Sequence, residues 1–142
     1  MIDSNNVPDV ADNELLARFI LNSNETRDDG TVKPKLFLPY RRIELSVNRH
    51  REATSDETWQ VGRDVATARS KQLYGLSNIR ASSCRIETLD VAATPILANN
   101  PNHADIVGYP PKKEDQMSLA TKIAAATERP WVKAPLLPGD NG

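Results

Sequence analysis

The segment 41–69 restricts the possible folds of this chain more than any other, because its pattern predicts a strand, a polar turn and a helix. Apolar and polar side chains alternate over residues 43–48, with the period of two that marks a strand buried on one face. Thr54 offers a helix N-cap, and acidic side chains follow it in the first turn. Trp59 then begins a stripe spaced for one face of a helix. We expect this strand–helix unit to form the centre of the fold, with Trp59 packed on the strand.

Two further helices are predicted, one before this unit and one after it. Residues 111–127 carry acids in the first turn and one apolar face. Residues 15–21 fit either a helix or a buried strand, and we favour a helix capped near Asp12. The central helix is expected to end at Gly75, which can adopt a left-handed conformation.

The remaining apolar segments predict extended chain. Residues 36–38 lie between two prolines and are expected to be extended. Residues 77–97 predict two strands, or a short helix and a strand, and residues 104–107 predict one more strand. Together these elements predict the α+β class, with a small, mostly antiparallel sheet covered by two or three helices.

One domain is expected from the length of 142 residues. Residues 1–11 are polar and predict a disordered N-terminus, so the domain is placed at 12–128. Residues 129–142 contain several prolines and predict an extended tail outside the core. Apolar side chains in this tail are candidates for contact with a partner: Trp131, Leu136 and Leu137.

The compartment is indicated by the cysteine content and by the N-terminus. Cys84 is the only cysteine, which excludes an intramolecular disulfide and suits a reducing compartment. The N-terminus is polar and acidic, unlike a signal peptide, and no apolar run reaches the ~20 residues of a membrane span. We therefore expect a soluble, cytoplasmic protein.

Basic side chains are concentrated in segment 33–51, although the chain as a whole has a formal net charge of −1. They are Lys33, Lys35, Arg41, Arg42, Arg49 and Arg51. This stripe could bind an anionic partner such as nucleic acid, or it could face the acidic residues of the N-terminal 30 residues. The low overall charge favours the second interpretation.

Candidate catalytic residues are few. Arg49 and His50 follow the predicted strand 43–48, and His103 follows a loop and precedes another strand, so Arg49 and His103 could line one cleft as anion clamp and proton carrier. The alternative for Arg49 is an ion pair with Glu52, Asp56 or Glu57. Cys84 lacks the local signature of a catalytic thiol. The two histidines lack metal-ligand spacing, so we predict no metal and no cofactor.

Three segments, LSVNRH (45–50), LYG (73–75) and NPNHADIVGYP (100–110), resemble those of a group of small bacterial proteins to which no function is attached. The resemblance would run from about Leu16 to Ala126. It implies a bacterial, cytosolic origin and implies no substrate, cofactor, partner or functional residue.

These patterns support three hypotheses of function, in the following order. The first is a non-catalytic interaction or accessory module of a bacterial multi-protein system, with another protein as its partner, since the chain has no complete catalytic motif and has an apolar, proline-rich exit. The second is a small enzyme or nucleotide-binding domain with a cleft around His103, Arg49 and His50. The third is a nucleic-acid-binding accessory protein that uses the basic stripe.

Overall fold

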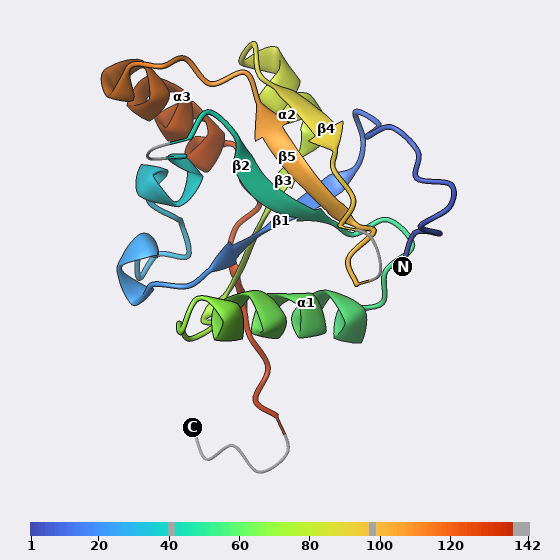
Figure 1. Ribbon diagram of the computed structural model, residues 1–142. Helices are drawn as coiled ribbons and strands as arrows, with labels where there is room; N and C mark the ends of the chain where they lie inside the picture. Colours follow the sequence, from blue (N-terminus) through green and yellow to red (C-terminus); the bar gives the residue numbers. More distant parts are fainter. Residues whose placement is uncertain (40–41, 97–98, 138–142) are drawn as a thin grey trace.

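A computed structural model describes residues 1–39, 42–96 and 99–137, which form one six-stranded sheet and three α-helices (Figure 1). The strands are β1 (Leu15–Ile20), β2 (Leu45–Arg49), β3 (Gly75–Arg80), β4 (Asp90–Ala93), β5 (His103–Val107) and β6 (Val132–Lys133). The helices are α1 (Ser55–Ala68), α2 (Ala81–Ile86) and α3 (Lys113–Ala125), with short 3-10 helices at Ser23–Glu25 and Pro34–Phe37. The strand order is β4-β5-β2-β1-β3-β6, and every neighbouring pair is antiparallel. The predicted α+β class is confirmed.

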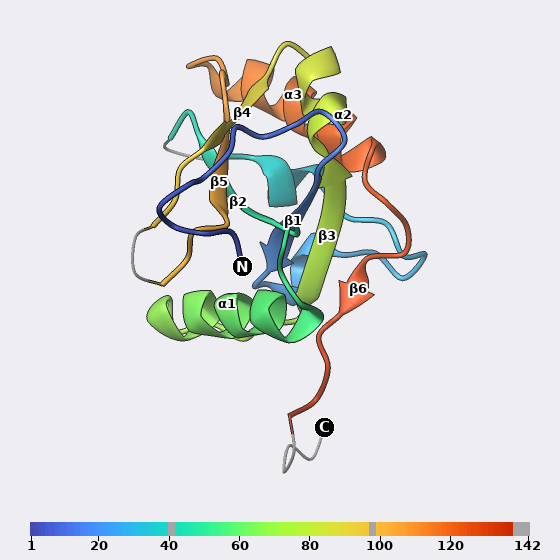
Figure 2. The same ribbon diagram turned by 90° about the vertical axis from the view of Figure 1, so that its right-hand side faces the viewer.

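The two faces of the sheet are covered unequally. Figures 1 and 2 show α2 and α3 on one face and α1 alone on the other. The main hydrophobic core lies on the α2–α3 face, where Leu16, Val47 and Ile106 meet Ile123. On the α1 face the fully packed cluster is small, consisting of Ala17, Trp59 and Leu76 with partly buried neighbours. The α1 face is therefore the side on which open space can remain between the helix and the sheet.

The central strand–helix unit forms as predicted, with two corrections. Thr54 caps α1 through a capping box, in which its side chain accepts from the Glu57 backbone and Glu57 accepts from the Thr54 backbone. The strand begins at Leu45 rather than at Ile43, whose side chain is 56% exposed. The helix ends at Ala68, and the left-handed residue beyond it is Ser70 at φ 53°, not Gly75.

Trp59 is buried, but its partners differ from those expected. It packs against Ala17 of β1 and Leu76 of β3. The expected packing on the strand 43–48, through Leu45 or Val47, is therefore wrong. The physical reason is the direction of the β2 side chains, since Leu45 and Val47 point into the core on the α2–α3 face. α1 therefore packs under β1 and β3.

Residues 15–20 form the strand β1, so the favoured helix is wrong. β1 pairs with β3 over six residues and with β2 over two, and it is therefore interior to the sheet. Apolar side chains are buried on both of its faces, with Leu16 on one and Ala17 on the other. A strand buried on both faces loses the alternation that distinguishes a strand from a helix.

The other predicted segments differ from expectation at one place and agree with it elsewhere. Residues 34–37 form a 3-10 helix begun by Pro34, rather than extended chain, and Leu36 and Phe37 are completely buried against the core. The segment predicted as two strands or as a helix and a strand contains β3, α2 and β4 in turn. The predicted helix over 111–127 and the strand over 104–107 are confirmed as α3 and β5.

The N-terminal residues are packed rather than disordered. Ile2 and Val10 are buried, with 2% and 5% of their surfaces exposed. The Ile2 backbone N–H donates to Asn102 Oδ1 at 2.9 Å, and the Met1 ammonium group pairs with Glu57 at 3.2 Å. The prediction failed because the composition of residues 1–11 is polar, whereas two apolar side chains and these hydrogen bonds hold the segment in place.

The tail begins as part of the fold, which corrects its expected place outside the core. Val132 and Lys133 form β6 on β3, and the Trp131 ring packs against the main core. A side chain at Gly75 would meet the Trp131 ring and the Val132 carbonyl group, so the close approach of β6 requires glycine at Gly75. Beyond Ala134, Leu136 is 69% exposed.

Truncation should separate these two parts of the tail. Ending the chain after Ala134 should change the free energy of unfolding by less than about 0.5 kcal/mol, because mainly exposed residues are lost. Ending it after Glu128 should cost more than about 2 kcal/mol, because the Trp131 ring and β6 leave the fold. Urea unfolding of both chains tests this, and equal stability would mean that β6 contributes nothing.

Within the residues that the structure describes, no helix is long and apolar enough to cross a bilayer.

Candidate functional site

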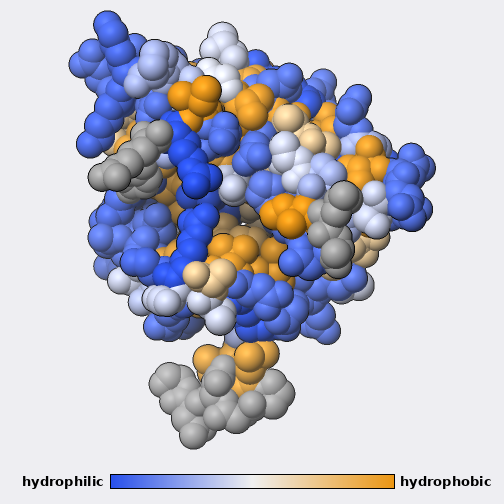
Figure 3. All heavy atoms as spheres, in the orientation of Figure 1, coloured by the Kyte–Doolittle hydropathy of each residue, from blue (hydrophilic) through white to orange (hydrophobic). Residues whose placement is uncertain are grey.

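A cleft of about 1070 Å³ lies between α1 and the sheet, on the thinly packed face. Its walls come from β1, β2 and β5, from the C-terminal end of α1, and from single residues between these elements: Leu38, Pro39, Arg42, Glu44, Ile96 and Asn100. On the face shown in Figure 3, hydrophobic surface lies between strongly hydrophilic side chains. Apolar wall residues include Phe19, Leu21, Leu38, Val65, Ala68 and Ile96. The cleft thus combines an apolar interior with a polar boundary.

Strand alternation explains which side chains reach the cleft. Ser46 and Asn48 of β2 point to the α1 face, and so do His103 and Asp105 of β5. Asn48 lies directly opposite His103 in the β2–β5 register. The floor of the cleft is therefore polar even though the other face of the same strands is apolar.

The cleft extends over the region where β1 and β2 no longer pair. The two strands pair only through Leu16 with Arg49 and Ala17 with Asn48. Beyond this point the Arg18 guanidinium group donates to the Ser46 carbonyl and the Leu36 carbonyl, both at 3.0 Å. A side chain thus satisfies a β2 carbonyl in this unpaired region.

Two buried amides form the most unusual feature of the wall. Asn100 Nδ2 donates to Asn48 Oδ1 at 2.8 Å, and the two residues are only 8% and 2% exposed. Asn48 Nδ2 and Asn100 Oδ1 have no hydrogen-bond partner. Buried polar atoms without partners are rare in folded proteins and call for an explanation at each place where they occur. Both residues line the cleft, and the pair leaves one donor and one acceptor that have no partner and are themselves covered.

His103 is held in one orientation at the floor of the cleft. Its Nδ1 lies 2.9 Å from the Thr94 carbonyl oxygen and 2.9 Å from the Thr94 hydroxyl. A carbonyl oxygen can only accept, so Nδ1 carries the proton in that bond, and in the neutral ring Nε2 is the acceptor. Thr94 thereby holds the His103 ring in one orientation.

One part of the polar boundary of the cleft carries basic side chains. Arg42, Arg69 and Lys71 line the cleft with exposed side chains, and none of them takes part in an ion pair among the described residues. Glu44 and Asp105 are the acids that accompany them with partly or fully exposed side chains. With Arg18 and Glu25, which also line the cleft, four cations face three acids, a difference of one charge. Arg42 precedes β2, whereas Arg69 and Lys71 lie together just after α1, so two segments converge here only in the fold.

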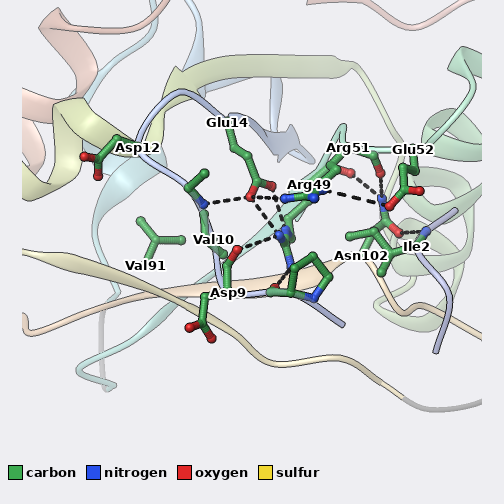
Figure 4. A network of polar contacts seen from close by, with 12 residues as sticks. Ile2, Asp9, Val10, Asp12, Glu14, Arg49, Arg51, Glu52, Val91 and Asn102 are labelled. Carbon is green, nitrogen blue, oxygen red and sulfur yellow. Dashed lines mark hydrogen bonds and ion pairs between the residues drawn. The ribbon is translucent and has the colours of Figure 1, made fainter. Parts of the chain in front are cut away.

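Arg49 does not line this cleft. Figure 4 shows it enclosed by the N-terminal segment, where its Nε and Nη2 atoms donate to the two Glu14 carboxylate oxygens at 2.7 Å. It also donates to the Pro8 and Asp9 carbonyl oxygens, and its side chain is 0% exposed. A guanidinium group with these partners is not an available anion clamp. The expected cleft shared by Arg49 and His103 is therefore wrong, because odd and even positions of β2 point to opposite faces.

The Arg49 network has a defined electrostatic effect on Glu14. Burial raises the pKa of Glu14, but the hydrogen bonds from Arg49 and from the Ala11 backbone N–H, with the charges of Arg49 and Arg51, outweigh it. The net result is a pKa below the ordinary value of 4.5. The pair Arg49–Glu14 is structural, and Glu14 was not among the partners considered from the sequence.

His50 lies in a separate, smaller pocket of about 290 Å³ near the start of α1. Its Nε2 is 2.7 Å from Asn78 Oδ1. Trp59 and Thr58 also line this pocket. The predicted grouping of His103, Arg49 and His50 thus falls into three different environments.

Cys84 does not form a reactive site. Burial raises the pKa of the Cys84 thiol to about 12, so it is protonated at neutral pH. In the described ranges, no group of three or more histidine, cysteine, aspartate or glutamate side chains could hold a metal ion.

The basic stripe does not form one surface. Arg49 is buried, and Arg51 lies 3.6 Å from Glu14 and 3.9 Å from Glu52. Lys33 and Lys35 are partly buried, and Arg42 belongs to the boundary of the cleft. Arg41 lies outside the described residues.

The residues of the cleft were largely missed from the sequence. Asn48 is one of the polar positions of the strand predicted at 43–48, and Asn100 belongs to the loop before His103. The usable signal was an asparagine in an interior strand, since such a residue must find partners when it is buried.

Comparison with protein-family models, with curated proteins and with solved structures finds no match for this chain.

Proposed function

We propose that the protein is a non-catalytic interaction module that binds an extended segment of another protein in the cleft between α1 and the sheet. The observation that carries the proposal is the cleft itself, which at about 1070 Å³ slightly exceeds the ~300–1,000 Å³ of most small-molecule pockets. It follows the chain from Glu44, just before β2, to Asn48 within β2, a length of roughly 15 Å at ~3.3 Å per residue. About five extended residues of a partner match this length.

The boundary favours an acidic segment. Arg42, Arg69 and Lys71 can pair with carboxylates of the partner while the apolar wall covers its hydrophobic side chains. Such contacts at a partly solvated boundary favour selectivity and rapid association. The alternative of an enzyme has lost the grouping of His103 with Arg49, and the alternative of nucleic-acid binding has lost its continuous basic stripe.

The cellular setting belongs to the same proposal. A bacterial, cytoplasmic accessory subunit is consistent with a single buried thiol, since a reducing compartment favours free cysteine. Leu136 and Leu137 are exposed by 69% and 41%, and they offer a second apolar contact for the same partner.

Selection from a displayed random peptide library tests the proposal. The wild-type protein should enrich acidic peptides, and Ala68→Trp should lose them, because an indole placed at the exposed Ala68 position fills the cleft. Thr67→Trp is the matched control, since Thr67 is exposed on the same helix and does not line the cleft. Retention of the same peptides by Ala68→Trp would contradict the proposal.

A further inference from the structure

We propose that the Asn48–Asn100 pair recognises the main chain of the bound segment, by bonding the N–H and the C=O of a single extended residue. The inference rests on the proposed function and specifies how that site selects its partner. Its basis is the donor and the acceptor that the pair leaves unsatisfied in the wall of the cleft.

The chemistry of the pair does not depend on how the two amides are oriented. Each amide has an oxygen and a nitrogen, and one hydrogen bond between the two side chains uses one oxygen and one nitrogen. Turning both amides over exchanges the roles of Asn48 and Asn100 but again leaves one free nitrogen and one free oxygen. The pair therefore always offers a donor and an acceptor together.

An extended peptide supplies the complementary groups. Within a strand, the N–H and C=O of one residue point to the same side, and opposed residues of antiparallel strands exchange both bonds in this way. The amide pair stands on the α1 face of β2, where the cleft runs along the strand. Because both atoms are covered in the unbound protein, the two amides must turn toward the cleft as the segment binds. A segment lying there then satisfies both atoms with one residue, whatever its side chain is.

The burial of the pair makes this contact selective. With exposures of 2% and 8%, neither amide is freely solvated in the unbound protein. A ligand that hydrogen-bonds to both free atoms removes the energetic cost of two buried polar atoms without partners. A ligand that covers the pair without bonding to it leaves that cost in place. The boundary cations would then select acidic side chains, and the amide pair would require an unblocked main chain beside them.

The experiment uses the peptide enriched most strongly by the wild-type protein, with analogues each methylated at one main-chain nitrogen. One analogue should bind the wild-type protein roughly tenfold or more weakly, since methylation removes a donor and leaves its buried acceptor unpaired. Asn48→Leu/Asn100→Leu should bind the unmodified peptide more weakly by a similar factor and should no longer distinguish that analogue.

This double variant should fold, because replacing both hydrogen-bonding partners by apolar side chains of similar shape is close to neutral for stability. Its melting temperature checks this, and Asn100→Ser supplies the same binding comparison if the double variant unfolds. Equal binding of the unmodified peptide by either folded variant and the wild-type protein would overturn the inference. So would a peptide that tolerates every methylation but depends on an Asn or Gln side chain.

The two proposals fail in different ways. If Ala68→Trp retains the enriched peptides, the cleft is not the binding site and the proposed function fails. If Ala68→Trp loses the peptides while Asn48→Leu/Asn100→Leu retains them, the cleft binds the segment and only the role of the amide pair is overturned.

Discussion

Glu14→Leu is expected to destabilise the protein by about 3–5 kcal/mol, since removing one partner of a buried ion pair leaves the other charge uncompensated. The charge left behind is that of Arg49, whose side chain is 0% exposed and whose Nε and Nη2 atoms lie 2.7 Å from the Glu14 carboxylate. Urea unfolding at neutral pH measures the effect. A loss below about 1 kcal/mol would show that water or the Pro8 and Asp9 carbonyl groups suffice to stabilise this charge.

The exposed pair of Arg85 with Asp12 is the matched control, with the same 2.7 Å separation. Asp12→Asn should cost no more than about 1 kcal/mol, because exposed ion pairs contribute little. Glu14→Leu/Arg49→Leu should lose less than Glu14→Leu alone, because the unpaired charge is then absent.

The pH dependence of the Glu14→Leu effect follows from the lowered pKa of Glu14. A carboxylate whose folded pKa is depressed contributes stability that is fully present above its unfolded pKa. This contribution is lost as the pH falls below the ordinary value of 4.5 and through the folded pKa. The stability difference between the wild-type protein and Glu14→Leu should therefore shrink in acid.

Trp59→Ala is expected to cost about 3–5 kcal/mol, the usual range for deleting a buried tryptophan side chain. Trp59 is 7% exposed and joins α1 to β1 and β3 through Ala17 and Leu76. The cluster is small, so few other contacts can compensate for the loss. Thr67→Ala, on the exposed side of the same helix, should change stability by less than about 0.5 kcal/mol. A Trp59→Ala melting curve that matches the wild-type curve would mean that α1 is held by other contacts.

The predictable parts of the fold are those with one buried face. α1 and α3 show a helical stripe, and β2 shows alternation, so their type follows from periodicity alone. β1 is buried on both faces and carries no such signal. The register of β6 on β3 is a long-range pairing, which no local pattern encodes.

The candidate site was harder to predict than the fold. Alternation along β2 puts Arg49 on the same inward face as Leu45 and Val47. Its partner Glu14 lies 35 residues earlier in the chain and was therefore missed, while the acids nearest in sequence were considered. The cleft depends on the short pairing of β1 with β2 and on the position of α1 below the sheet, and both are consequences of tertiary packing.

The most direct test of the binding site is the mapping of amide chemical shifts in isotopically labelled protein as an enriched acidic peptide is added. The cleft predicts that the largest changes occur from Glu44, just before β2, to Asn48, at Val65 to Lys71 and at Asn100 to Asp105, which approach the cleft from three sides. Changes confined to Trp131–Leu137 would contradict the account and would place the binding site on the tail.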